Sequence, residues 1–427
     1  MTSYWAERAM LPTGLAHGVL IKTAHGVIKG IEVDAPPSGT RLPGLAVPGF
    51  ANAHSHAFHR ALRGTTHSDG GTFWNWRERM YAVAATLTPD SYRELATAVF
   101  AEMVLAGYTV VGEFHYVHGQ PDGAPYVDSG AMELAILDAA AAAGIRITLL
   151  DALYLAGGVH KPLTQEQLRF SDGSVEAWNA RRSSLPESPT SRIGAAIHSV
   201  RAVSPAQIAE VAALGLGTVH AHVSEQPAEN DSARAAYDAT PVGLLNDLLG
   251  PDFTAVHATH VTADDIRALG GSHVCFCPTT ERDLADGIGP ARALADAGAR
   301  LALGSDQNAV IDPLEELRGL EMNERLASGQ RGRFSPAELL SAATTNGYTS
   351  LGWAGGTIAV GQLADFVTID TASTRTVGSD LDQIWLTATT ADVRNVVVHG
   401  ALVVTDGVHR LGDVAALLAA SIERTRS

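Results

Sequence analysis

From Thr109 onward, short runs of apolar and β-branched residues alternate with longer stretches rich in Ala and Leu. This alternation is typical of repeated βα units that build a parallel sheet. With a first strand that ends near Asn52, the pattern predicts eight strands, and eight βα units predict an α/β fold of the closed (β/α)8 barrel type. The other seven predicted strands are Val110–His115, Ile145–Leu153, Ile193–Val200, Thr218–Ser224, Thr254–His260, Val274–Pro278 and Leu301–Ser305.

Two of the stretches between these strands carry clear signals for the start of a helix. Pro89–Ala106 follows Thr88, and Pro205–Leu214 follows Ser204. A hydroxyl side chain before the first turn accepts a backbone N–H bond, and Pro fits the next position because it lacks an N–H group. We therefore expect both stretches to be helices that begin at the proline.

The two ends of the chain have a different pattern. Val19–Val33 and Asp365–Asp406 are rich in Val, Ile, Thr and Gly, contain turn residues and show little helical periodicity. They predict a small β-sandwich domain that is assembled from both termini. We expect this domain to comprise residues 1–47 and 361–427, and the barrel to comprise residues 48–360.

Composition narrows the classes of partner. The chain has 427 residues, of which 46% are hydrophobic and 18% are charged, as is ordinary for a globular enzyme with a large core. Its formal net charge of −16 predicts that it binds neither nucleic acid nor an anionic membrane, because both would be repelled. An anionic substrate would need arginines placed at its site. We also expect a homodimer.

The N-terminal region and the cysteines indicate in which cellular compartment the protein is expected. Met1–Pro12 contains Glu7 and Arg8 within a short apolar pattern and lacks the apolar run of a signal peptide. No stretch reaches transmembrane length. The two cysteines, Cys275 and Cys277, lie in one predicted buried strand, which excludes a disulfide framework and favours inert core thiols over a metal pair. We expect a cytoplasmic protein.

The strongest local signal is a pair of histidines that follows the first predicted strand. His54 and His56 are separated by one residue at the end of the segment Pro48–His56. Residues i and i+2 of an extended segment share a face, so both imidazoles can bind a divalent ion over the carboxyl end of the barrel. Alone, this spacing is weak evidence, because paired histidines also satisfy hydrogen bonds in protein cores.

Further histidines and carboxylates fall at the ends of later predicted strands. Taken singly, each is more often a structural cap than a ligand. Their joint placement favours a metal-dependent active site, because the carboxyl ends of all barrel strands meet at one mouth. These residues are His198, His222, Glu225, His257, His260 and Asp306.

On these residues the sequence resembles the amidohydrolase superfamily, whose members join a His-x-His of strand 1, histidines of strands 5 and 6 and an Asp of strand 8 around one or two metals. Gly356–Phe366 is similar to the segment with which these enzymes return to their small β domain. The metal ligands that the resemblance implies are His54, His56, His222 and Asp306.

The resemblance also bears on the number of metal ions. Binuclear members bridge two metals with a Lys from strand 4, and no lysine of this chain lies on Ile193–Val200. A mononuclear site is therefore implied, with one position open to water. Zn2+ is the default for such nitrogen and oxygen ligands, and Fe2+ and Mn2+ are alternatives.

The spacing of His222 and Glu225 resembles the deaminase subset of the superfamily. In that subset, a Glu three residues after the strand-5 ligand takes a proton from water and supplies protons to the departing nitrogen. The resemblance implies that Glu225 is catalytic and that His257 and Asp306 orient the attacking water. The competing interpretation is that Glu225 caps the helical turn that follows it.

Five segments resemble the formimidoylglutamate deiminase family more narrowly: His54–Phe58, Thr72–Glu78, Gly112–Tyr116, His198–Val203 and Cys277–Glu281. This resemblance implies hydrolysis of N-formimidoyl-L-glutamate to N-formyl-L-glutamate and ammonia, a step of histidine degradation. A small-molecule dicarboxylate as substrate agrees with paired arginines, whose planar guanidinium groups donate two hydrogen bonds each to a carboxylate. The substrate-binding residues that the resemblance implies are His59, Arg77, Tyr116, His198 and Arg201.

Three alternatives remain open at this point. A deaminase of an aromatic base of the guanine or pterin type would use the same metal centre, although a neutral ring does not require Arg77 and Arg201. A non-catalytic barrel that serves as a scaffold is expected to have lost ligands. Either arginine could instead belong to a structural ion pair. His59 stands where the family often has Gln, which affects substrate preference rather than reaction type.

Overall fold

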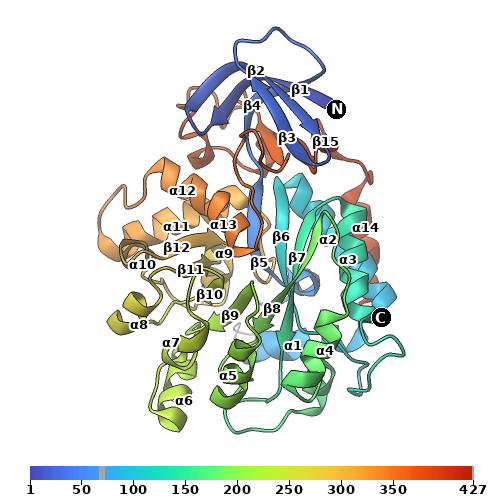
Figure 1. Cartoon of the computed structure of the whole chain (residues 1–427), viewed down its shortest axis with the longest axis vertical. Helices are drawn as coiled ribbons and strands as arrows, with labels where there is room; N and C mark the ends of the chain where they lie inside the picture. The colour runs from blue at the N-terminus through green and yellow to red at the C-terminus, as the bar shows by residue number, and fades with distance from the viewer. Residues whose placement is uncertain (67–72, 426–427) are drawn as a thin grey trace.

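The computed structural model describes residues 1–66 and 73–425 of the chain (Figure 1). Thr72, the first residue of one of the five segments singled out above, lies outside the described residues. A small β domain lies at one end of the molecule, and the barrel with its helices forms the rest.

The barrel is a sheet of eight parallel strands in the order β12-β11-β10-β9-β8-β7-β6-β5. Its two edge strands approach each other, because a parallel bridge joins Ser55 to Asp306 and the amide N–H of His56 donates to Asp306 O at 2.9 Å. The ring is therefore nearly closed. The strands are β5 (Phe50–Ser55), β6 (Tyr108–His115), β7 (Arg146–Leu153), β8 (Ser191–Ile197), β9 (Val219–Val223), β10 (Phe253–His257), β11 (His273–Phe276) and β12 (Arg300–Leu303).

These strands confirm the eight that the hydrophobic pattern predicts, with differences of a few residues at their ends. The first strand was expected to end near Asn52, but β5 continues to Ser55. The extension has a physical cause, because Ser55 pairs with Glu113 of β6 and remains part of the ladder.

Helices connect the strands and cover the outside of the barrel (Figure 1). Both predicted helix starts are confirmed: α2 begins at Pro89 after Thr88, and α5 begins at Pro205 after Ser204. The α-helices are α1 (Phe73–Thr86), α2 (Pro89–Leu105), α3 (Ala131–Ala143), α4 (Val175–Ser183), α5 (Pro205–Ala213), α6 (Pro227–Tyr237), α7 (Pro241–Leu244), α8 (Ala263–Ala268), α9 (Pro278–Asp283), α10 (Ala291–Asp296), α11 (Pro313–Ser328), α12 (Pro336–Ala343), α13 (Thr345–Ser350) and α14 (Val414–Arg424). Short 3-10 helices are η1 (Ala57–Leu62), η2 (Gln165–Phe170), η3 (Asn246–Leu248), η4 (Ile384–Leu386) and η5 (Thr390–Asp392).

The small β domain combines both ends of the chain, as the sequence predicts. Its strands follow the order β16-β15-β14-β13-β4-β1-β2-β3, in which β13 pairs antiparallel with β4 and β1 pairs parallel with β4. The limits at residues 47 and 361 stay a prediction. The strands are β1 (Thr2–Leu11), β2 (Gly14–Ala24), β3 (Val27–Glu32), β4 (Thr40–Pro48), β13 (Phe366–Ile369), β14 (Val393–Val398), β15 (Ala401–Thr405) and β16 (Val408–His409).

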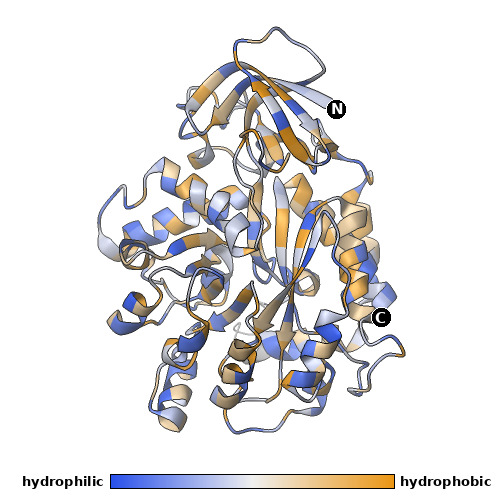
Figure 2. Cartoon of the chain, viewed as in Figure 1, coloured by the Kyte–Doolittle hydropathy of each residue, from blue (hydrophilic) through white to orange (hydrophobic). Residues whose placement is uncertain are grey.

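Apolar residues concentrate on the strands and on the helix faces that pack against them (Figure 2). Cys275 and Cys277 are both free and fully buried, in a cluster with Ala53, Val256 and Ala302. The expected absence of a disulfide framework is therefore confirmed for both cysteines. None of the helices in residues 1–66 and 73–425 combines the length and apolar character that crossing a bilayer requires.

A buried ion pair joins the barrel to the return segment. Arg146 at the start of β7 donates from Nε and Nη2 to the two carboxylate oxygens of Asp365, at 3.0 and 3.2 Å. Both side chains are fully buried. The Tyr348 hydroxyl and the His399 amide N–H also donate to this carboxylate, at 3.0 and 2.7 Å. Asp365 therefore fixes the point where the chain leaves the barrel for β13.

We expect Arg146→Met to lower the free energy of unfolding by about 3–5 kcal/mol, because it leaves a buried carboxylate without its cation. The matched control is Arg93→Met, which removes an exposed arginine 3.4 Å from Asp90 and should cost about 0.5 kcal/mol or less. Urea denaturation followed by fluorescence measures both changes. Equal shifts of the two unfolding midpoints would contradict the prediction.

Candidate functional site

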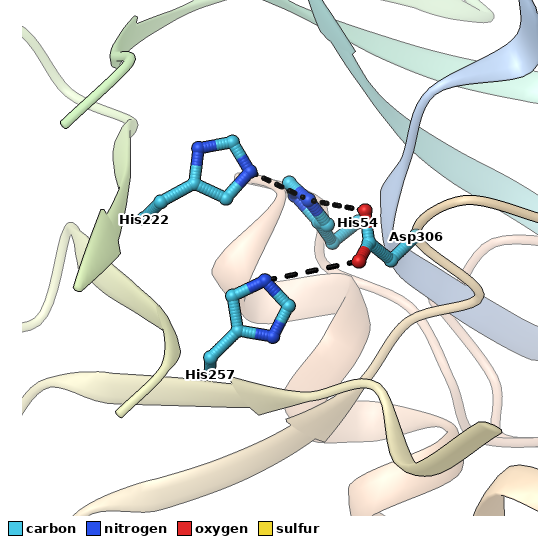
Figure 3. Close-up of side chains that lie close together, drawn as sticks. All are labelled: His54, His222, His257 and Asp306. Atoms are coloured by element: carbon cyan, nitrogen blue, oxygen red, sulfur yellow. Dashed lines mark hydrogen bonds and ion pairs between the residues drawn. The ribbon is translucent and has the colours of Figure 1, made fainter. Parts of the chain in front are cut away.

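Four predicted ligands meet at the carboxyl ends of three barrel strands. His54 lies on β5, His56 directly follows it, His222 lies on β9 and Asp306 follows β12. The Nε2 atom of His222 is 3.2 Å from that of His54 and 3.3 Å from that of His56. Asp306 Oδ1 is 3.4 Å from His54 Nε2 and 3.5 Å from His56 Nε2. Figure 3 shows His54, His222 and Asp306 converging, together with His257.

These distances fit a tetrahedral ion. Ligand atoms about 2.0–2.1 Å from a tetrahedral metal lie about 3.3–3.4 Å from one another. Four of the six distances between donor atoms are 3.2, 3.3, 3.4 and 3.5 Å, and all four side chains are buried. The group is therefore a candidate site for a divalent cation.

The protonation of the histidines also suits a metal. Nδ1 of His56 donates to the Phe114 carbonyl at 2.8 Å, and Nδ1 of His222 donates to the His198 carbonyl at 2.7 Å. These bonds select the tautomer whose Nε2 lone pair points to the centre. Burial lowers the pKa of His222 to about 4 and holds the pKa of His56 well below its usual range. The imidazoles are therefore neutral, as metal binding requires.

The Asp306 carboxylate in this group needs a cation beside it to be ionised. Burial, opposed by His257 and reinforced by Glu225 and Glu281, raises the pKa of Asp306 to about 7. An ionised Asp306 is thus costly here unless positive charge lies beside it. A divalent ion among the three imidazoles supplies that charge.

The backbone at these strand ends is strained. Ser224, His257 and Asp306 adopt φ of 51°, 70° and 42°, in the left-handed region that residues with a side chain rarely occupy. Each such residue costs on the order of 1–3 kcal/mol, and such residues cluster where geometry serves function. The strain at the ends of β9, β10 and β12 therefore supports a functional site at this end of the barrel.

His257 and Glu225 lie beside the four donors. His257 Nε2 is 3.8 Å from Asp306 Oδ2 and 4.0 Å from Glu225 Oε1, and its Nδ1 is 3.4 Å from Glu281 Oε1. Burial lowers the pKa of His257, but Glu225, Glu281 and Asp306 outweigh it, so the pKa lies well above its usual range. His257 thus carries a proton in this setting, unlike the neutral His56.

Glu225 is ionised and does not cap a helix. Burial opposes ionisation, but His257, His222 and Arg201 outweigh it and lower the pKa of Glu225. The N-cap residue of α6 is Gln226, which follows Glu225 in the chain. The Glu225 carboxylate instead lines the cavity described below.

Three other groupings of possible ligands exist in the described part of the chain. His56, His59 and Asp306 form a buried set that shares two residues with the predicted ligands. His257 can replace His56 in a set with His54, His222 and Asp306. His115, His118 and Glu133 form a separate buried set. In that set Arg181 Nη1 already lies 2.8 Å from Glu133 Oε1, so a cation is present without a metal. We interpret the set of His115, His118 and Glu133 as a buried charge network.

A cavity of about 450 Å3 opens onto the cluster, within the usual size of small-molecule sites. It brings together the predicted residues, apart from the fully buried His54 and from His260, whose Nε2 bonds to the Asp286 carbonyl at 2.7 Å instead. Its lining includes residues to which the sequence assigns no role, among them Tyr81, Tyr154, Gln167 and Glu229. Tyr154 directly follows a predicted strand and could have been found by that position, whereas Gln167 and Tyr81 carry no such signal. The predicted residues in the lining are His56, His59, Arg77, Tyr116, His198, Arg201, His222, Glu225, His257 and Asp306.

One wall of the cavity holds His59 and Tyr116 together. His59 Nε2 and the Tyr116 hydroxyl are 2.8 Å apart in a hydrogen bond. Among the described residues, His59 Nδ1 has no hydrogen-bond partner. A histidine at position 59 therefore fixes the Tyr116 side chain on this wall of the cavity.

Arg201 brings a positive charge to the cavity on a partly buried side chain. Its Nε has no hydrogen-bond partner in residues 1–66 and 73–425, and no ion pair of Arg201 occurs there. Burial disfavours its charge, but Glu229 and Glu225 outweigh that effect and raise its pKa. The interpretation of Arg201 as half of a structural ion pair is thus not supported within the described residues. Arg77 stacks over the Tyr81 ring at 5.4 Å.

The family model of the amidohydrolase family matches residues 45–403. The chain therefore belongs to the amidohydrolase family, as its barrel, its small β domain and its cluster of histidines with an aspartate indicate. It is 39% identical over 435 residues to a formimidoylglutamate deiminase of Pseudomonas aeruginosa, with 96% of each chain covered.

Solved structures share the fold. An amidohydrolase from Brucella melitensis superposes with a TM-score of 0.89 at 31% identity, with 100% of both chains covered. An adenosine deaminase from Xanthomonas campestris, solved with bound zinc, superposes with a TM-score of 0.85 at 22% identity, covering 100% of this chain and 98% of its own. The second comparison shows the fold alone.

Proposed function

We propose that the chain hydrolyses N-formimidoyl-L-glutamate to N-formyl-L-glutamate and ammonia, as a step of histidine degradation. The observation that carries this proposal is the partly buried side chain of Arg201, which has no ion pair within the described residues and lines the cavity beside the candidate metal site. A substrate carboxylate would supply the missing partner. The 39% identity to a formimidoylglutamate deiminase over 96% of the chain supports the same substrate.

For the metal ligands we propose His54, His56, His222 and Asp306. His56 is preferred over His257 because its Nε2 lies 3.3 and 3.5 Å from the nearest donor atoms and its imidazole is neutral. One Zn2+ ion fits the nitrogen and oxygen donors, and zinc is present in the adenosine deaminase of the same fold. Metal analysis of the purified protein distinguishes Zn2+ from Fe2+ or Mn2+.

A bound divalent ion supplies Lewis acidity, which makes water a stronger acid and a better nucleophile at neutral pH. The ionised Glu225 accepts a proton from the attacking water as its oxygen adds to the formimidoyl carbon. The same carboxyl group then protonates the imine nitrogen, which becomes an amine on the tetrahedral adduct. It next takes the proton of the adduct's hydroxyl and passes it to that amine, so that the C=O bond forms as the C–N bond breaks and ammonia leaves. His257, which lies 3.8 Å from Asp306 and 4.0 Å from Glu225, would orient the attacking water together with Asp306.

The remaining predicted residues would bind the substrate. Arg201 and Arg77 would each pair with one carboxylate, because guanidinium groups form two parallel hydrogen bonds to a carboxylate. His198, which follows β8, and Tyr116, held by His59, would contact the chain between the carboxylates and the formimidoyl group.

Arg201→Met should lower kcat/KM for N-formimidoyl-L-glutamate by about 10- to 1000-fold, because charge-assisted hydrogen bonds contribute roughly 1.5–3 kcal/mol each and misalignment adds to the loss. Metal content should stay unchanged. Arg201→Lys is the matched control and should restore activity only in part, since it keeps the charge but not the planar fork. Ammonia release measures both variants, and wild-type kcat/KM in Arg201→Met would refute this assignment.

The broader alternative is a deaminase of an aromatic base, such as guanine or a pterin, at the same centre. Ammonia release from N-formimidoyl-L-glutamate, its α-amide and guanine separates the two functions. We expect activity on the dicarboxylate and strong discrimination against the amide. Faster release from guanine would overturn the proposed substrate while leaving the metal site in place.

A further inference from the structure

Gln167 at the edge of the cavity holds two tyrosines by their hydroxyl groups. Its Oε1 accepts the Thr164 backbone N–H at 2.9 Å, and a backbone N–H can only donate. This bond fixes which end of the amide is the nitrogen. Nε2 of Gln167 therefore donates to the hydroxyl oxygens of Tyr81 and Tyr154, at 3.0 and 2.9 Å.

The direction of these two bonds determines what the tyrosines offer to a ligand. Each hydroxyl oxygen accepts from Gln167, so each O–H proton must point elsewhere. Within the described residues neither proton has an acceptor, and both side chains line the cavity. Burial raises the pKa of Tyr154, so this phenol keeps its proton at neutral pH. Tyr81 and Tyr154 therefore present two hydrogen-bond donors to the cavity.

Two arginines, Arg77 and Arg201, bring positive charge close to these donors. The Arg77 guanidinium carbon lies 5.4 Å from the centre of the Tyr81 ring. Arg201 and Arg77 both lower the pKa of Tyr154 by their charge, although burial outweighs them. The Tyr154 ring also lies 4.5 Å from the ring of His198. Two O–H donors beside two cations favour an anionic acceptor over a neutral one.

Neighbouring elements pack closely around the Gln167 side chain. The three residues come from separate elements: Tyr81 from α1, Tyr154 from the segment after β7 and Gln167 from η2. Gly157 lies against the amide, and a Cβ atom at that position would be 2.6 Å from Gln167 Oε1. The absence of a side chain at position 157 thus allows the loop to pack over the amide.

We propose that Tyr81 and Tyr154, oriented by Gln167, form a carboxylate-binding pair that donates two hydrogen bonds to one carboxylate of the substrate. Tyr81 and Tyr154 are binding residues, and Gln167 is a positioning residue that acts through them. This inference rests on the proposed function for the identity of the substrate, but the predicted ligand class, a dicarboxylate, can be tested without turnover.

The test is the binding of glutarate, a five-carbon dicarboxylate without a formimidoyl group, to the metal-loaded full-length protein by calorimetry. Tyr81→Phe and Tyr154→Phe should each weaken glutarate binding about 10-fold, because each loses one charge-assisted hydrogen bond. In turnover assays the same variants should raise KM with little change in kcat. The control is Tyr4→Phe, which removes a hydroxyl that donates to Gly400 O in the small β domain and should leave glutarate binding unchanged.

Gln167→Glu tests the positioning role. It places an acceptor where the amide donates, so both hydroxyl protons turn away from the cavity, and glutarate binding should weaken by about 10-fold or more. In the Tyr81→Phe/Tyr154→Phe background the same change should add little, since the hydroxyls through which it acts are absent. A full additional loss there would show that charge repulsion alone is responsible and would overturn the role of Gln167.

The outcomes separate this inference from the proposed function. No glutarate binding by the wild-type protein, or wild-type affinity in both Tyr→Phe variants, would overturn the carboxylate-binding pair. Suppose that glutarate binding is weakened in those variants but the wild-type protein releases no ammonia from N-formimidoyl-L-glutamate. That result would support the carboxylate-binding pair and refute the proposed substrate.

Discussion

Replacing His56 or Asp306 with alanine should remove the bound divalent ion and abolish turnover while the barrel stays folded. Each variant deletes one of four donors spaced 3.2–3.5 Å apart, and three donors at an open site hold a metal less firmly than four. Residues at the carboxyl end of a barrel serve function more than stability. Metal analysis by mass spectrometry and ammonia release measure the two effects, and circular dichroism reports the fold.

The matched control for the metal is His257→Asn. His257 belongs to the alternative set of possible ligands, but its Nε2 lies 3.8 Å from Asp306, and Glu225, Glu281 and Asp306 raise its pKa. We expect this variant to retain the ion and to lose activity, because the water loses an orienting group. If His257→Asn lost the ion and His56→Ala retained it, His257 would be the metal ligand and His56 would be the residue that orients the water.

Glu225→Gln should lower kcat by about 100- to 10,000-fold, the usual contribution of one acid–base group. Glutamine keeps the size of the side chain but cannot take a proton from water. The metal should be retained, because the carboxylate of Glu225 is outside the proposed ligand set. Steady-state kinetics of ammonia release, with metal content determined on the same sample, measures the change.

Glu229→Gln provides the comparison for Glu225. Glu229 lies in the first turn of α6 and lines the same cavity, where its carboxylate accepts the Glu225 backbone N–H at 3.3 Å and interacts by charge with Arg201. Its replacement should act mainly on KM. Full activity in Glu225→Gln, or equal losses of kcat in both variants, would mean that Glu225 is not the proton-transfer group.

Much of the fold could be predicted from local patterns. Each barrel strand is buried along most of its length and reads as an apolar run, so all eight could be counted from the sequence. Thr88 and Ser204 marked the starts of α2 and α5, because capping depends on residues within one turn. The strand ends were less exact, since pairing such as that of Ser55 with Glu113 involves a distant segment.

Part of the candidate site could likewise be predicted from the sequence, and part of it required the tertiary structure. The sequence by itself determined the His-x-His spacing and the placement of His222 and Asp306 after strands, because these follow from position along the chain. Only the tertiary structure brought Asp306 within 3.4 Å of His54, since closure of the barrel joins residues from its first and last strands. The choice between His56 and His257 likewise required distances and buried charges.

Contacts between distant segments also decided the features for which the sequence gives no signal. Gln167 meets Tyr81 across 86 positions of the chain, and Arg146 meets Asp365 across 219. Hydropathy and spacing report only which face of its own element a residue occupies. The packing of the elements decides which side chains meet across the barrel mouth. It also decides which group, such as Arg201, is left for a ligand. The tertiary structure alone determined both.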